Sequence, residues 1–212
     1  MMTWALAQIV IRLARIRVVG REHLPPAGAP VVIASNHIGW IDPFAIIAAL
    51  GPTRKVVFLA AREHIEKRRV LDWLLTRLGA VIKVERTSLR QREVLRAAEA
   101  TITGGASIAL FPEGRINVIA ETGQPLLPFE PGAAVIARRS GVLILPMAIA
   151  GSDDLYFGRR ITIAIGPPIS PGATHRDDEA TTTCLRDAIL ALRPPTPPHN
   201  RLRIGRWLGR LA

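Results

Sequence analysis

Residues 31–50 read VVIASNHIGWIDPFAIIAAL and contain two regular elements with a polar turn between them. Residues 31–34 form a short apolar run rich in β-branched side chains, which is typical of a strand buried on both faces of a sheet. Asp42 and Pro43 commonly begin a helix, because Asp caps free backbone N–H groups and proline fits the first turn. We therefore predict a buried strand, a loop and a helix that runs through Leu50.

The same alternation of strand and helix patterns continues along the chain. Further short runs of branched residues predict strands at residues 56–60, 80–84, 107–111, 142–149 and 161–165. A helix is predicted from Ser88, which forms a capping box with Gln91, to Gly104, and another at residues 175–192. The predicted class is α/β, with a mainly parallel or mixed central sheet flanked by helices and functional groups on loops at strand ends.

The length and composition of the chain suit one main domain. Its 212 residues, 49% of them hydrophobic, can fill a sizeable core. We expect an N-terminal amphipathic, membrane-associating helix at residues 1–18, the folded domain at residues 19–193, and a proline-rich linker with a basic amphipathic tail at residues 194–212. The single cysteine, Cys184, excludes an intramolecular disulfide framework, and its place beside Ala188 in a late helix predicts core packing.

Both ends of the chain have basic, amphipathic patterns. As a helix, residues 3–17 would place Gln8, Arg12 and Arg15 on one narrow face, the pattern of a helix that lies in a membrane surface. A helix packed on the domain with a basic outer stripe is the alternative. Residues 201–211 show a similar pattern, with a disordered basic tail as the alternative. The arginines interrupt the N-terminal apolar run, so no membrane span is expected.

The charge of the chain predicts an anionic partner. Lys and Arg number 28 against 17 Asp and Glu, a formal net charge of +11. Such a charge favours nucleic acid, a phosphorylated substrate or acidic lipid. Nucleic acid is not expected, because the chain has no helix-turn-helix, zinc-finger or aromatic RNA-binding pattern.

His37 and Asp42 are the candidate catalytic pair. Imidazole titrates near neutral pH and can act as a general base, and a turn can bring the carboxylate five residues later to its other ring nitrogen. Taken alone, the pair also fits an ordinary loop histidine and a helix N-cap. The other four histidines show no metal-ligand spacing, so we expect no metal.

Four short segments occur in a fixed order along the chain. They are NHIGWID at residues 36–42, GAVIKVER at 79–86, FPEGR at 111–115 and LPM at 145–147. These segments resemble the four sequence blocks of phospholipid and glycerol acyltransferases of the bacterial PlsC type. That family carries N-H-x-x-x-x-D, a glycine-led strand ending in Arg, F-P-E-G-T-R, and a V-P-V-like strand. The resemblance covers roughly residues 18–170.

The resemblance implies acyl transfer from acyl carrier protein or coenzyme A thioesters to the hydroxyl of a lysophospholipid, 1-acyl-sn-glycerol 3-phosphate above all. His37 would deprotonate the acceptor hydroxyl, Asp42 would orient and charge the imidazole, and no covalent acyl-enzyme or further cofactor would be needed. The chemistry agrees, because a lipid hydroxyl needs a base whereas a thiolate leaves readily. The implied place is the cytoplasmic face of the cell membrane, in phospholipid biosynthesis.

The resemblance also implies an acceptor-binding site. Its residues would be Phe111, Pro112, Glu113 and Gly114, which shape the site, with Glu113 touching polar groups of the glycerol, and Arg86, which meets the acceptor phosphate.

The third block departs from the family pattern. Arg115 occupies the usual Thr position, while Ile116 and Asn117 stand where Arg and a small polar residue are expected. Either Arg115 supplies the guanidinium from the neighbouring position, or the acceptor is a different lyso-lipid or a glycolipid. A non-catalytic protein that binds lipid at the membrane surface is the further alternative.

Overall fold

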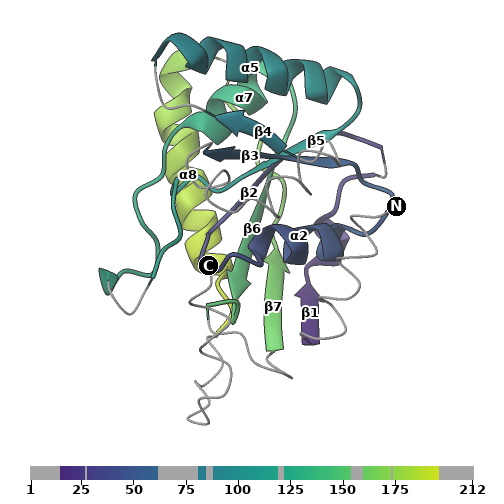
Figure 1. The fold of residues 1–212 in the computed structure, drawn as a ribbon, viewed down its shortest axis with the longest axis vertical. Helices are drawn as coiled ribbons and strands as arrows, with labels where there is room; N and C mark the ends of the chain where they lie inside the picture. The colour runs from purple at the N-terminus through teal and green to yellow at the C-terminus, as the bar shows by residue number, and fades with distance from the viewer. Residues whose placement is uncertain are drawn as a thin grey trace.

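The computed structural model describes residues 15–26, 28–61, 81–84, 88–118, 122–153, 160–172 and 174–195. Within these residues the chain forms a seven-stranded sheet with the strand order β1-β7-β6-β2-β5-β3-β4 (Figure 1). The strands are β1 (Arg15–Val19), β2 (Val32–Ser35), β3 (Val56–Ala61), β4 (Val81–Val84), β5 (Ser107–Leu110), β6 (Ile144–Ala150) and β7 (Arg160–Ile165). The helices are α2 (Asp42–Leu50), α5 (Ser88–Thr103), α7 (Gly132–Ser140) and α8 (Asp178–Leu192), with short 3-10 turns η1 (Arg21–His23) and η2 (His175–Asp177).

The sheet is mixed. The strands β6, β2, β5, β3 and β4 run in one direction, whereas β7 is antiparallel to β6 and β1 lies parallel to β7. The carboxyl ends of β2, β5 and β6 therefore meet at one edge, where the loops of an α/β sheet usually carry functional groups. The predicted α/β class is confirmed.

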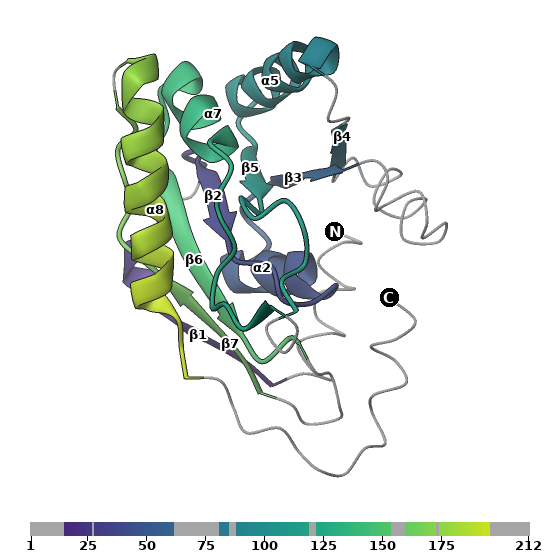
Figure 2. The ribbon, with the colours of Figure 1, turned by 90° about the vertical axis from the view of Figure 1, so that its left-hand side faces the viewer.

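The two faces of the sheet are covered by different helices. Figure 2 shows α7 and α8 on one side of the sheet and α2 on the other. On β2, Ile33 packs in the cluster that includes Phe44 and Ile46 of α2, whereas Val32 and Ala34 pack with α5, α7 and α8. All of β2 is buried, which explains why residues 31–34 are continuously apolar instead of alternating.

The N-terminal helix expected to reach residue 17 does not extend that far. Residues 15–19 form β1, which pairs with β7 from Arg15 opposite Arg160 to Val19 opposite Ala164. Exposure alternates along the strand, with Ile16 and Val18 packed against the core. This period of two is that of a strand. The expected boundary between residues 18 and 19 thus falls within β1, and the rest of the expected helix lies outside the described residues.

The other expected elements agree closely with the structure. The five further strands and the two helices lie within two or three residues of their predicted bounds. The expected core position of Cys184 is wrong, because its side chain is exposed. On α8 the buried positions are Asp178, Thr181, Leu185 and Ile189, spaced by about one helical turn, and Cys184 lies off that stripe. Residues 196–212, with most of the expected linker and tail, lie outside the described residues.

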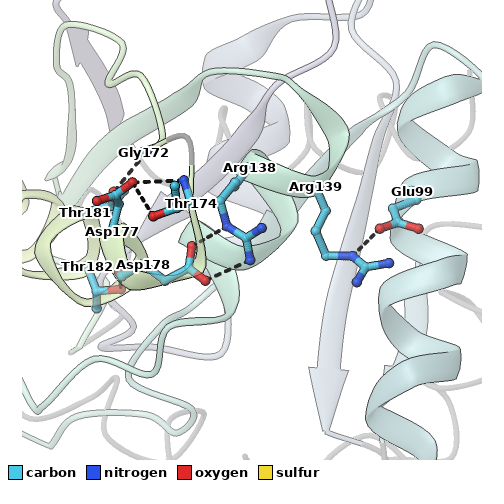
Figure 3. A network of polar contacts seen from close by, with 9 residues as sticks. All are labelled: Glu99, Arg138, Arg139, Gly172, Thr174, Asp177, Asp178, Thr181 and Thr182. Carbon is cyan, nitrogen blue, oxygen red and sulfur yellow. Dashed lines mark hydrogen bonds and ion pairs between the residues drawn. The ribbon is translucent and has the colours of Figure 1, made fainter.

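Ion pairs join α7 to both neighbouring helices (Figure 3). Arg138 Nε and Nη2 donate to Asp178 Oδ1 and Oδ2 of α8 at 2.8 and 2.9 Å, the two-pronged geometry that strengthens an arginine–carboxylate pair. The next residue, Arg139, pairs with Glu99 of α5. These contacts hold the helical layer that lies opposite α2. None of the described helices is long and apolar enough to cross a membrane.

Candidate active site

His37 and Asp42 lie at the carboxyl edge of the parallel strands. His37 follows β2, which sits between β6 and β5, and Asp42 is the first residue of α2. The imidazole Nδ1 and the carboxylate Oδ2 are 2.8 Å apart. The loop between strand and helix thus brings the two candidate catalytic side chains into direct contact.

The carboxylate of Asp42 turns back toward the loop instead of capping its own helix. Its Oδ2 accepts the backbone N–H groups of Ile38 at 2.8 Å and Gly39 at 2.9 Å, in addition to the imidazole. No side-chain hydrogen bond caps the start of α2. The side chain is fully buried, and a buried carboxylate is held in one orientation by such charge-assisted bonds. The N-cap alternative is therefore not the role that Asp42 has here.

The ring of His37 is held on two sides. Asp42 binds Nδ1, and the ring of Phe111 stacks on the imidazole with 4.0 Å between centroids and 13° between planes. A neutral imidazole carries one N–H, so the tautomer that donates from Nδ1 to the carboxylate has its lone pair on Nε2. The side chain is 16% exposed, which leaves it accessible to a substrate. This is the arrangement that a general base requires.

The main chain of His37 is also fixed. Its N–H donates to Glu113 Oε1 at 3.0 Å, and its C=O accepts the N–H of Asn117 at 2.6 Å. Glu113 Oε2 accepts the N–H of Leu127 at 2.8 Å. Burial raises the pKa of Glu113, and this effect outweighs the lowering by these two backbone bonds and by the charges of His37 and Arg193.

Asn36 joins the loop to β6. Its amide donates from Nδ2 to the C=O of Ile149 at 2.9 Å and accepts at Oδ1 the N–H of Ile149 at 2.7 Å. The side chain is fully buried and so continues the β2–β6 hydrogen bonding beyond the strand end. Gly39 touches Ser152, and a Cβ there would lie 2.2 Å from the Ser152 carbonyl oxygen, so no larger residue fits without movement of the backbone.

Asn36→Ala is expected to lower the free energy of unfolding by about 2–6 kcal/mol. It removes both partners of Ile149, and each buried backbone group left without a hydrogen bond costs about 1–3 kcal/mol. Urea unfolding measures the loss. Gln124→Ala is the control, because it removes an exposed amide side chain. An equal loss in the two variants would contradict the structural role of Asn36.

The structure gathers most of the expected acceptor-binding residues beside the dyad. Phe111 stacks on His37 and Glu113 binds its main chain. Pro112 is buried and its C=O accepts the N–H of Glu130 at 2.9 Å. Gly114 has φ 68°, a left-handed conformation that glycine adopts without strain, and it closes a turn whose next residue, Arg115, is exposed. Arg86 lies outside the described residues, so its role stays a prediction.

Two residues of this region were not among the candidates from sequence. Asn36 was named only as the first letter of its motif, and Asn117 only as a departure from the family pattern. Both are fully buried polar residues with contacts to distant segments, Asn36 to Ile149 and the N–H of Asn117 to the C=O of His37, which a sequence pattern does not report. Among the described residues, no three His, Cys, Asp or Glu side chains gather where they could hold a metal ion.

The chain is similar in sequence to known proteins. The family model described as Acyltransferase matches residues 15–150. The 1-acyl-sn-glycerol-3-phosphate acyltransferase alpha of Homo sapiens is 30% identical over 193 residues, which cover 84% of this chain and 63% of that protein. A chloroplastic 1-acyl-sn-glycerol-3-phosphate acyltransferase of Brassica napus is 28% identical over 136 residues, 64% of this chain and 37% of that protein. The chain thus spans only part of the length of these relatives.

A solved structure has the same fold. It is the 1-acyl-sn-glycerophosphate acyltransferase PlsC from Thermotoga maritima, with a TM-score of 0.69 and 19% sequence identity. The match covers 90% of this chain and 78% of that one. The likeness is therefore one of overall fold.

Proposed function

The chain belongs to the acyltransferase family, and from this premise we propose that it transfers a fatty acyl group from a thioester to the hydroxyl of a lysophospholipid. The observation that carries the proposal is the buried Asp42 carboxylate, 2.8 Å from Nδ1 of a histidine that remains partly exposed. A base that is oriented by a carboxylate and accessible to solvent suits deprotonation of a hydroxyl.

The reaction needs one histidine and one carboxylate. Nε2 of His37 takes the proton of the acceptor hydroxyl as its oxygen attacks the thioester carbonyl carbon. Asp42 stabilises the imidazolium that forms. The tetrahedral intermediate then collapses, so that the new C–O bond remains and the C–S bond breaks. The imidazolium returns its proton to the departing thiolate, and the dyad is restored for the next cycle.

The acceptor we propose is 1-acyl-sn-glycerol 3-phosphate. The names of the relatives support this choice, and the exposed Arg115, one residue beyond the Glu113–Gly114 turn, offers a guanidinium for the phosphate. Acyl carrier protein or coenzyme A thioesters are the proposed donors. Both are anionic, as is a phospholipid surface, and a chain with a net charge of +11 attracts such partners. We place the reaction at the surface of the cell membrane, on its cytoplasmic face.

Mass spectrometry of reaction products tests the proposal. The purified protein is given mixed lyso-lipids, glycolipid acceptors included, with acyl carrier protein and coenzyme A thioesters in separate reactions. We expect phosphatidate as the main product. Acyl transfer to another lyso-lipid or a glycolipid alone would support the proposed acyl transfer but overturn the proposed acceptor. Liposome binding without transfer to any acceptor would contradict the enzymatic function.

A further inference from the structure

The connection between β5 and α7, described at residues 111–118 and 122–131, contacts the main chain of His37 on both sides of its Cα atom. Glu113 accepts the His37 N–H, and Asn117 donates its backbone N–H to the His37 C=O. The ring of Phe111, at the start of the same connection, stacks on the imidazole. One segment, 76 residues from His37 at Glu113, thus holds the histidine at three points.

Both carboxylate oxygens of Glu113 are already bound by the protein. Oε1 accepts from the N–H of His37 at 3.0 Å and Oε2 from the N–H of Leu127 at 2.8 Å. The residue is 7% exposed. A carboxylate with both oxygens directed at backbone donors and so little accessible surface is poorly placed to bind an acceptor hydroxyl. Its geometry is that of a bridge between the catalytic loop and the far half of the connection.

Asn117 provides the second contact, and its side chain is fully engaged in shaping the connection. Nδ2 donates to the C=O of Gln124 at 3.1 Å, and Oδ1 accepts the hydroxyl of Thr122 at 2.8 Å. The residue is fully buried. Its amide therefore ties Asn117 to Thr122 and Gln124 and holds the backbone that presents the Asn117 N–H to His37. Asn117 departs from the family pattern, and its polar side chain stabilises the connection through these two hydrogen bonds.

We propose that Glu113 is a positioning residue for His37 and not a contact of the acceptor: its carboxylate and the Asn117 N–H fix the peptide units on either side of the histidine. Asp42 orients the imidazole ring, whereas the β5–α7 connection fixes the backbone from which the side chain of His37 extends. Precise placement matters, because a displacement of about 1 Å at a reacting group can lower a rate by about 10²-fold.

Steady-state kinetics of Glu113→Gln tests the proposal, which rests on the proposed acyl transfer. Glutamine offers one acceptor to two N–H donors, so one bond is lost. We expect kcat to fall about 10-fold to 100-fold and KM for 1-acyl-sn-glycerol 3-phosphate to stay within about 2-fold, because positioning and not ground-state binding is impaired. Glu130→Gln is the matched control, since it makes the same change at an exposed position of the same connection. A 10-fold rise in KM with unchanged kcat would show that Glu113 binds the acceptor and overturn the proposal.

Nuclear magnetic resonance of the His37 ring gives a readout that needs no activity. With ring-labelled histidine and no substrate, Glu113→Gln is expected to shift the His37 resonances and their pH titration, and Glu130→Gln to leave both unchanged. An unshifted His37 in folded Glu113→Gln would contradict the proposal even if the acyltransferase assignment failed. Where Glu113→Gln does not fold, Thr122→Val serves instead, because it removes the hydroxyl that donates to Asn117 and accepts the exposed N–H of Gln124, and it touches no contact of Glu113. It is expected to shift the same resonances by less, and unchanged resonances would count against the proposal.

Discussion

His37→Ala is expected to lower the rate of acyl transfer by about 10²-fold to 10⁴-fold, the usual contribution of a positioned general base. The protein should remain folded, because the side chain is partly exposed and Asp42 keeps its two backbone N–H partners. The measurement is kcat with a labelled acyl thioester and 1-acyl-sn-glycerol 3-phosphate.

His23→Ala is the matched control for this variant. It removes another partly buried histidine, whose Nδ1 pairs with the C=O of Ile165 and not with a carboxylate. The rate of the control should stay close to that of the wild type. If His37→Ala transferred acyl groups as fast as His23→Ala, the catalytic assignment would be wrong.

Asp42→Asn is expected to lower kcat by a similar factor, about 10³-fold to 10⁴-fold, as loss of the orienting carboxylate does in Ser–His–Asp enzymes. The amide is neutral and cannot stabilise the imidazolium. The change also weakens three hydrogen bonds to one buried oxygen and places a new donor at Oδ1, which has no hydrogen-bond partner among the described residues. A loss of about 1–3 kcal/mol in unfolding free energy should accompany it.

The double variant separates catalysis from stability. If Asp42 acts through His37, then Asp42→Asn should slow His37→Ala little further, because residues that act as a unit are not additive. Urea unfolding of each variant at the assay temperature shows how much folded enzyme is present. Fully additive losses in kcat would mean that Asp42 contributes to the reaction independently of the histidine.

Local patterns predicted the central part of the fold well. The strand at residues 31–34, the turn and the helix from Asp42 each follow from a short stretch of sequence, and the dyad spans only five residues. The strand β1 was not predicted, because its partner β7 lies about 145 residues away and the apolar positions at its start also fit a helix. The alternation of Arg15, Ile16, Arg17 and Val18 is the local sign of this strand, but it is too short to outweigh the helical pattern before it.

In the site, too, local contacts were predictable from the sequence and contacts between distant segments were not. The contact between His37 and Asp42 was visible in the spacing, but the two bonds of Glu113 were not, because they join segments 76 and 14 residues apart. A family pattern marks the residue without saying what it touches. Cys184 shows that an error of one residue in the buried stripe is enough to misplace a side chain, because its neighbour Leu185 is buried and Cys184 is exposed.

The β5–α7 connection also bears on how acceptor preference can diverge within such a fold. Its inward residues, Glu113 and Asn117, are buried, whereas Arg115 is exposed and Val118 is 43% exposed. Buried and exposed positions of one short segment are thus under different constraints. A mutant library confined to Arg115 and Val118 leaves the contacts of His37 with Asp42, Phe111, Glu113 and Asn117 in place, so such variants can be screened for new acceptors while the dyad stays as it is.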